Sequence, residues 1–227
     1  MTIAYRSSSA SVQTTSGGAG AITLTAPSGY QAGDLLVLTV ATGSSVSPAV
    51  PSGFTQSAAS SVFNHVTHKQ YQKIAGSESF PYTITSLGSD GCATLACYSS
   101  PDPTTPFDAY AWNTAGSTTS VVVPSLTTAH ANEMLVHTAF AHTGAPATFT
   151  TPSGFTLRAT SSYIDGSLLR YLYHCDALQS AAGATASVTD TWSATQTYLT
   201  GIVAAYNSVL STPQFWTDFI KSQEVDS

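Results

Sequence analysis

Residues 33–40, GDLLVLTV, and the PSGF motif at residues 51–54 decide the fold of this chain, because the same pattern occurs twice. In the second copy, NEMLVHTAF at residues 132–140 leads into PSGF at residues 152–155. Each copy opens an apolar run of strand-forming residues with an acidic residue, and a polar loop separates that run from the motif. The repeat predicts two similar structural units.

The repeat divides the chain into four parts. We expect a first unit over residues 21–106 and a second over residues 107–210. Residues 1–20 are rich in Ser, Thr and Gly, which predicts a flexible arm that is ordered only if something else holds it. Residues 211–227 follow the second unit as a C-terminal tail.

Smaller segments also correspond between the two units. We match the three valines at 121–123 with the strand that begins at Ile22, and residues 173–177 with residues 71–75. The strand that ends at Tyr206 is matched with the one that ends at Tyr98. Short strands with frequent turn signals predict an all-β protein. We expect two tandem repeats forming antiparallel β-sandwich, jelly-roll-like lobes, which either merge or stay separate.

The composition excludes some classes of partner. Only 8% of the residues are charged, and the formal net charge is -6 with six dispersed Lys and Arg residues. Phosphate binding needs clustered cations, so we expect no nucleic-acid partner. The N-terminus has no apolar signal-peptide core, and no apolar run has the ~20 residues of a membrane-spanning helix. We expect a soluble protein that is made in a cytosol and has no membrane partner.

Cysteines and histidines offer no predicted chemistry. Cys92 and Cys97 lie five residues apart on a predicted strand, so they point to opposite faces and cannot form a disulfide with each other. With Cys175, they are expected to be buried free thiols. Two histidine pairs have odd spacings, His65 with His68 and His137 with His142, which place their side chains on opposite faces of a strand.

No metal, cofactor or catalytic residue is therefore predicted. The acidic residues occur mostly at turns and strand openings, where turn formation already explains them. The sequence contains no Gly-x-Ser-x-Gly motif and no Gly-rich phosphate loop. We expect that the protein is not an enzyme.

Aromatic residues leave glycan binding open. Sugar sites use exposed aromatic faces beside hydroxyl and amide groups, and Tyr171 and Tyr173 share a face of one predicted strand. Ordinary packing in the sandwich core is the alternative for these residues. The other aromatic candidates are Trp112, Tyr163, Trp192 and Tyr198.

The C-terminal tail carries the predicted partner-contact residues Phe215, Trp216, Phe219 and Ile220. A closed sandwich does not need these side chains. The tail is therefore expected either to dock on the chain's own surface or to insert as an apolar plug into a neighbouring subunit.

Residues 20–210 resemble a family of β-sandwich virion proteins of tailed bacteriophages. The resemblance rests on the acidic-Leu-Leu-Val strand, both PSGF turns, the Tyr-x-Lys-x-Ala segment at residues 71–75 and the closing strands that end at Tyr98 and Tyr206. The second copy departs from the pattern, with Asn132-Glu133 in place of Gly-Asp. The resemblance implies a structural role in the virion and no catalytic residues.

The implied function is that of a capsid decoration, or cement, protein that stabilises the head. Its partners would be the major capsid protein, other virion proteins and further copies of itself, with a trimer as the expected assembly. The alternative is a receptor- or glycan-binding module of a tail fibre or surface adhesin. Such a protein would be assembled into the virion in the host cytoplasm.

Overall fold

The chain forms antiparallel β-sheets in two halves. The computed structural model describes residues 2–12, 20–62, 66–88, 91–143, 146–165 and 168–209. All regular elements in these ranges are β-strands, and every strand pair is antiparallel. The predicted all-β class is confirmed. Within the described ranges, no helix is long and apolar enough to span a membrane.

The first half builds one large sheet and one small one. Its strands are β1 (Ala4–Val12), β2 (Ile22–Leu24), β3 (Leu35–Thr42), β4 (Thr55–Val62), β5 (Val66–Ile74), β6 (Tyr82–Ile84) and β7 (Gly91–Ser99). The large sheet has the order β1-β7-β3-β5-β4, and β2 pairs with β6. Every residue of β3 is buried, as expected for a central strand that is covered on both faces.

The second half has the same strand order. Its strands are β8 (Phe107–Val123), β9 (Thr127–Thr128), β10 (Glu133–Thr143), β11 (Phe149–Thr150), β12 (Thr156–Asp165), β13 (Leu168–Gln179), β14 (Gly183–Ala184) and β15 (Val188–Tyr206). The run β8-β15-β10-β13-β12 repeats the order of the first sheet, while β11 also pairs with β15 and β9 pairs with β14.

Two strands of the second half are long because each spans the positions of two strands of the first half. β8 covers the positions of β1 and β2, and β15 covers those of β6 and β7. The end of β8 pairs with the start of β15, so that Val123 lies opposite Val188 as Leu24 lies opposite Tyr82 in the β2-β6 pair. Ser117, within β8, has a φ of 52°. This pairing confirms that the valines at 121–123 correspond to the strand that begins at Ile22.

One predicted correspondence was wrong by two residues. Leu35 pairs with Ile74 in the first half, whereas its counterpart Met134 pairs with Leu178. Residues 71–75 therefore correspond to residues 175–179 and not to 173–177. The cause is the pairing register, because a shift of two keeps every side chain on the same face and leaves the hydrophobic pattern unchanged.

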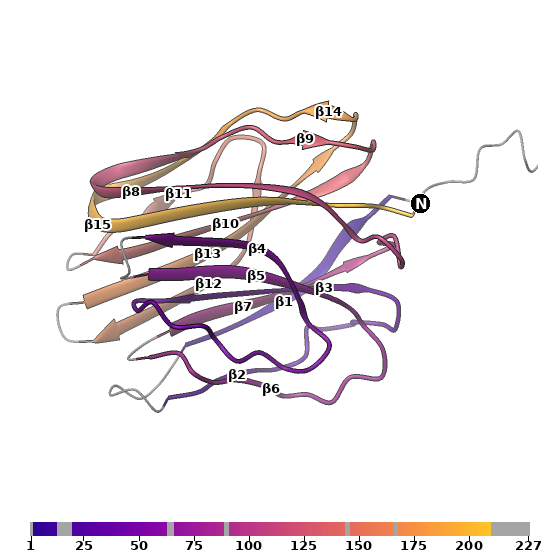
Figure 1. Cartoon of the computed structure of the whole chain (residues 1–227), viewed down its shortest axis with the longest axis horizontal. Helices are drawn as coiled ribbons and strands as arrows, with labels where there is room; N and C mark the ends of the chain where they lie inside the picture. The colour runs from indigo at the N-terminus through magenta and orange to yellow at the C-terminus, as the bar shows by residue number, and fades with distance from the viewer. Residues whose placement is uncertain are drawn as a thin grey trace, which may run out of the picture.

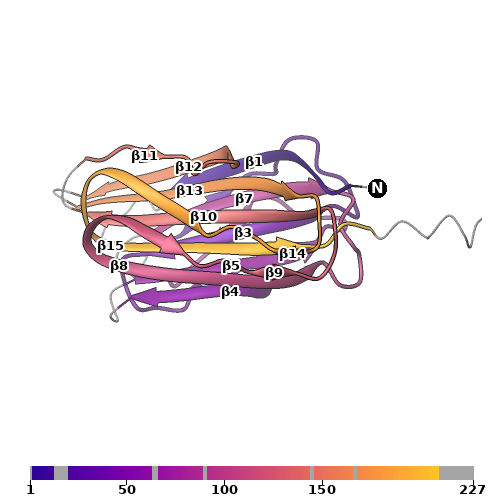
Figure 2. The same ribbon diagram turned by 90° about the horizontal axis from the view of Figure 1, so that it is seen from above.

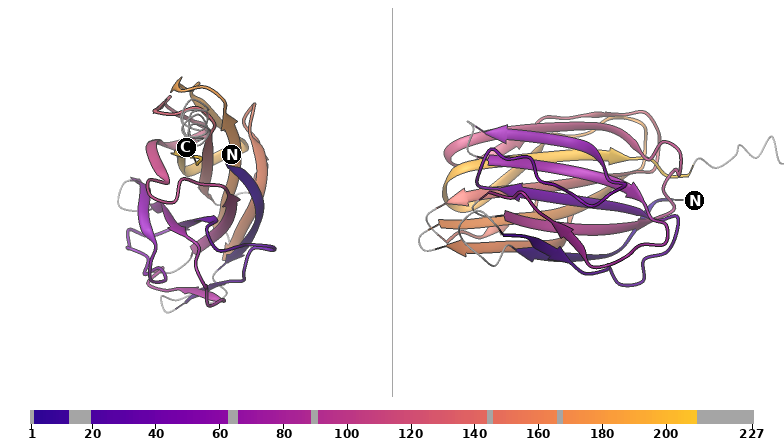
Figure 3. Two further views of the ribbon diagram at one scale, coloured as in Figure 1. Left: turned by 90° about the vertical axis from the view of Figure 1, so that its right-hand side faces the viewer. Right: turned by 60° about the horizontal axis from the view of Figure 1, so that its bottom comes forward.

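The two large sheets pack face to face and merge the halves into one body. One core cluster draws Leu35 and Val37 from the first half and Val136 and Ala204 from the second. Figure 1 shows β8 and β15 of the second half in the upper part and β2 and β6 of the first half in the lower part, while the orange strands β12 and β13 overlap the purple strands of the first half in this view. Figure 2 gives the view from above, and the left panel of Figure 3 looks along the strands. The alternative of two separate lobes is thereby excluded.

The halves contact each other reciprocally. β1 lies against β12, and β8 lies against β4. The closing tyrosines also reach across: the Tyr98 hydroxyl is 3.0 Å from Nε2 of His174, and the Tyr206 hydroxyl is 2.8 Å from the Ser57 hydroxyl. Each half therefore caps the other with an equivalent side chain.

The N-terminal arm predicted over residues 1–20 differs from the structure over its first part. Ala4–Val12 forms β1, which pairs with β7 from Ala4 opposite Ser99 onward. The segment is rich in Ser, but Ile3 beside it is 1% exposed and, with Tyr5 packed against the same cluster, anchors it in the core between the sheets. Residues 13–19 lie outside the described residues.

Candidate functional site

The PSGF turn of the first half borders a groove with a charged wall. We name it the first groove; Ser52, Lys73, Glu78, Ser79 and Tyr82 are among its lining residues. Nζ of Lys73 is 2.6 Å from Oε2 of Glu78, and the same carboxylate accepts a hydrogen bond from the Tyr82 hydroxyl. The ammonium group also lies 5.9 Å from the centre of the Phe54 ring.

The PSGF turn of the second half borders an apolar groove in the equivalent place. This second groove has a volume of about 510 Å³, and its walls include Leu135, Pro152, Phe155, Ala177, Val188 and Val203. The residues that line it include no charged side chain. By strand pairing, Ala177 takes the place of Lys73 and Val188 the place of Tyr82. The lysine of the ion pair and the tyrosine beside it are therefore replaced by smaller apolar side chains.

The turn glycines show the same difference. Gly53 and Gly154 have φ values of 88° and 84°, a conformation that favours glycine. A Cβ atom at Gly53 would lie 3.0 Å from Cε of Lys73, whereas one at Gly154 would meet nothing within 4 Å. The second groove is thus open beside its turn, where the first is occupied by the lysine side chain.

A buried ion pair lies behind the second groove. Nε2 of His137 is 2.6 Å from Oδ1 of Asp190, and both side chains are fully buried. Nδ1 of His137 is 3.0 Å from the carbonyl oxygen of Ile202, so it donates to that oxygen and one proton lies between Nε2 and Oδ1. Burial raises the pKa of Asp190. Both ring nitrogens of His137 are engaged by groups of the protein, so neither is available to a ligand.

The cysteines are buried and free, as predicted. Cys92 belongs to the core between the sheets and Cys97 to the core of the first half, which confirms that they point to opposite faces. Cys175 lies opposite His137 in the β10-β13 pairing. Burial raises the pKa of its thiol to about 12, so it stays protonated and unreactive at neutral pH.

An ion pair holds the acid that opens the central strand of the first half. Nε of Arg6 is 2.8 Å from Oδ2 of Asp34, which also accepts a hydrogen bond from the backbone N–H of Gln31. Arg6 lies where the register of β1 shifts between Tyr5 and Ser7. This bulge in β1 directs the Arg6 guanidinium group toward the Asp34 carboxylate.

Two acids meet at the equivalent place in the second half. The register of β8 shifts beside Tyr206, which gives Asp108 the position of Arg6 and places its carboxyl group close enough to Glu133 to affect the pKa of that residue. Glu133 is fully buried. Burial, with a further contribution from Asp108, raises the pKa of Glu133 to about 7. The Glu133 carboxyl group is therefore protonated below that pH.

The inner faces of the two sheets share a polar network. Nδ1 and Nε2 of His68 lie 2.6 and 3.0 Å from the hydroxyl groups of Thr200 and Thr138, and Nδ1 of His174 lies 3.2 Å from that of Thr94. Burial, followed by the charge of His137, lowers the pKa of both His68 and His174 to about 3. Both rings are therefore neutral at pH 7.

The histidines do not gather into a metal site. No group of three or more His, Cys, Asp or Glu side chains within the described ranges could hold a metal ion. His65 lies outside those ranges. His68 is in the network between the sheets, and His137 pairs with Asp190 on the outer face of its sheet.

The aromatic candidates separate into several places. Tyr171 and Tyr173 share a face, as predicted, with ring centres 6.2 Å apart, and Phe149 stacks on Tyr173 at 4.3 Å. Trp192 is buried, whereas Trp112 is 42% exposed on β8. The remaining candidates, Tyr163 and Tyr198, pack against the core between the sheets.

Several of these features have no local signal in the sequence. Asp108, Asp190 and Ala177 each gain their role from a strand partner far away in the chain. The repeat was the available signal, since aligning the two copies by strand pairing places each of them opposite a residue of different chemistry. The predicted contact residues Phe215, Trp216, Phe219 and Ile220 lie outside the described residues.

Comparison with protein-family models, with curated proteins and with solved structures finds no match to this chain.

Proposed function

We propose that this chain is a structural protein of a tailed-phage virion, a decoration protein that binds the major capsid protein and neighbouring copies of itself. Its work is mechanical: a rigid double sheet presents contact surface, and repeated weak contacts on a symmetric lattice reinforce one another. The sequence resemblance over residues 20–210 supports this assignment. So does the strand order, which the two halves share.

The observation that carries the proposal is the aromatic edge of β8. Tyr110 and Trp112 are 44% and 42% exposed on a strand that pairs only with β15 among the described residues. Between Tyr110 and Val123 this strand has no charged side chain. Natural proteins often protect edge strands with charges or prolines, which this stretch lacks, and exposed Tyr and Trp are the side chains that anchor interfaces. The edge fits a protein partner.

The fold supports the same proposal at a finer level. We infer that the chain is a duplicated jelly-roll-like unit, in which β2-β6 and the end of β8 with the start of β15 form the outer layer of each copy. A duplicated unit of this kind buries its inner faces against itself. Its edges and outer faces are then free for lattice contacts.

Binding to phage heads tests the proposed function. Heads that lack the protein should bind it stoichiometrically and gain resistance to heat. The double variant Tyr110→Ser with Trp112→Ser should bind at least tenfold more weakly. Leu157→Ser is the matched control, because Leu157 is 42% exposed on a different strand and should be dispensable. Heads that neither bind the protein nor gain stability would refute the proposal.

A second candidate function is glycan binding, and the stack of Phe149, Tyr173 and Tyr171 favours it. All three rings are partly exposed. Aromatic faces of this kind can stack on sugar rings. Titration with host surface glycans would distinguish the candidates, since Tyr173→Ala should abolish glycan binding and leave head binding unchanged. Lost adsorption with intact heads would favour this candidate over the first.

A further inference from the structure

The second groove is an apolar site that the described chain leaves open. Phe155, Val188 and Val203 form part of its walls, and no charged side chain lines it. Its volume of about 510 Å³ falls within the ~300–1,000 Å³ typical of clefts that bind a ligand or an anchoring side chain. Its rim is polar, with Ser153, Gln179 and Ser187 among the lining residues. Such a groove suits an apolar side chain flanked by polar backbone.

The chain continues beyond the described residues close to this groove. β15 passes through the groove wall at Val203, ends at Tyr206, and the described chain stops at Val209. Figures 1 and 2 show the end of β15 at the same end of the molecule as the N-terminus. Val203 and Val209 are six residues apart, which spans at most ~20 Å.

The tail has the side chains that this groove would accept. Phe215, Trp216, Phe219 and Ile220 lie within six positions, and Trp216 is seven residues beyond Val209. Seven residues reach at most ~25 Å, which is enough to return to Val203. The first groove offers no comparable site, because Lys73 and Glu78 line it with charge.

We propose that the C-terminal tail of the same chain docks in the second groove, with Trp216 as its anchor. Burying the indole in an uncharged cleft removes a large apolar surface from water. The two charged residues nearest to the anchor, Asp218 and Lys221, would stay at the rim. The inference concerns the isolated chain and holds whether or not the protein belongs to a virion.

Disulfide trapping in the full-length protein tests the proposal. The pair Thr217→Cys with Ser187→Cys places one thiol beside the anchor and one on the groove rim, while the three native cysteines are buried. We expect rapid cross-linking within one chain, seen as a fast-migrating monomer on non-reducing gels. The matched control is Thr217→Cys with Ser79→Cys, because Ser79 lines the first groove. It should cross-link at least tenfold more slowly.

Two further variants test the anchor and the groove. Adding Trp216→Ala or Ala177→Lys to the first pair should slow cross-linking about tenfold, the former by removing apolar burial and the latter by placing a charge in the groove. Cross-links between two chains would make the occupant a second copy and overturn the proposal. Equal trapping at both grooves, trapping at neither, or a rate unaffected by Trp216→Ala would also overturn it.

Discussion

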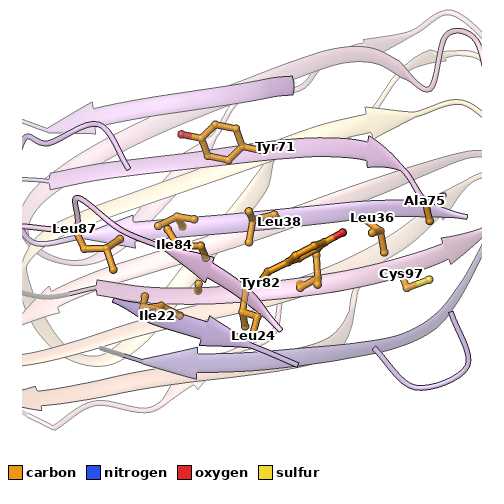
Figure 4. Packing of buried hydrophobic residues seen from close by; sticks show 13 residues of the cluster. Ile22, Leu24, Leu36, Leu38, Tyr71, Ala75, Tyr82, Ile84, Leu87 and Cys97 are labelled. Carbon is orange, nitrogen blue, oxygen red and sulfur yellow. The ribbon is translucent and has the colours of Figure 1, made fainter. Parts of the chain in front are cut away.

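The first and second halves of this protein share a strand order but place different chemistry at equivalent positions. Leu38 and Ile84 pack in the apolar core of the first half, which Figure 4 shows, and their counterparts by strand pairing are His137 and Asp190. Gly201 makes room for the latter pair, since a Cβ atom there would lie 2.6 Å from Oδ2 of Asp190. The backbone arrangement therefore does not depend on what fills it.

Each half has polar groups at positions where the other half has different chemistry. The second half has the buried pair of His137 and Asp190, which the first half lacks. It has no counterpart of the Lys73–Glu78 pair in its groove, and Asp108 takes the place of Arg6.

The first half balances Asp34 and Glu78 with cations. The second half keeps one such pair, Arg158 with Asp176, but it places Glu133 beside Asp108 and Asp190 beside His137. We therefore expect the stability of the second half to depend on pH through groups on its outer face. The contact between the halves should be weakened by acid.

The largest effect should come from acid. His68 and His174 have pKa values lowered to about 3 in the folded chain, below the usual 6.5. The unfolded chain therefore binds more protons below pH 6.5, and stability that is complete above that pH is lost as the pH falls toward 3. Each histidine should contribute roughly 3 kcal/mol between pH 7 and pH 4. Urea unfolding at several pH values measures this loss.

His174→Gln is the check on this prediction. The amide can still hydrogen-bond Thr94 and Tyr98 but does not titrate, so the variant should lose about half of the acid dependence. An unchanged pH profile would mean that the network between the halves is not the acid-labile element.

Converting the second half toward the first should produce the next largest effect. His137→Leu leaves the Asp190 carboxyl group buried without its partner, which should cost about 3–5 kcal/mol. The double change His137→Leu with Asp190→Ile recreates the apolar pair of the first half and should restore most of that stability. Thermal and urea unfolding of both variants test the comparison, and a double variant no better than the single one would contradict it.

The acid pair should make the protein less stable as the pH rises. Because the pKa of Glu133 is raised to about 7 from its usual 4.5, the folded chain binds the extra proton, and stability falls between about pH 4.5 and pH 7. The loss should be on the order of 2 kcal/mol. Asp108→Arg recreates the pairing of the first half and should abolish the decline, as measured by unfolding at pH 5 and pH 8. A decline that persists would show that Glu133 is not its source.

Substitutions at the equivalent positions Lys73 and Ala177 of the two grooves should have the smallest effect on stability. Lys73→Ala removes the partner of a carboxylate whose side chain is 4% exposed, and should cost about 1–2 kcal/mol. Ala177→Lys, tested in a Trp216→Ala background so that tail docking does not contribute, adds a flexible cation at the groove and should change stability by less than about 0.5 kcal/mol. Equal costs in unfolding measurements would mean that the two grooves are not as different as their lining residues indicate.

The sequence predicted the parts of this structure that depend on local pattern. The PSGF turns, the buried run at residues 35–42 and the closing strands at Tyr98 and Tyr206 follow from periodicity and turn chemistry. The shift of two residues at Ile74 and Leu178 could not be predicted, because both registers satisfy the same alternation.

Features that depend on strand partners far away in the chain could not be predicted from the sequence. β1 looked too polar for a strand, since its place depends on pairing with β7 and on the single buried side chain of Ile3. The meeting of Asp108 and Glu133 depends on a bulge in β8, which no local signal marks. The Lys73 ion pair likewise needed the fold of the 77–82 loop.

The reciprocal packing of the halves has an evolutionary consequence. β1 on β12 and β8 on β4 are equivalent contacts, as are the crossing tyrosines Tyr98 and Tyr206. Contacts related in this way are what two identical subunits make around a twofold axis. The gene fusion that made this chain would then have captured an ancestral homodimer, and covalent linkage freed each half to diverge without losing its partner.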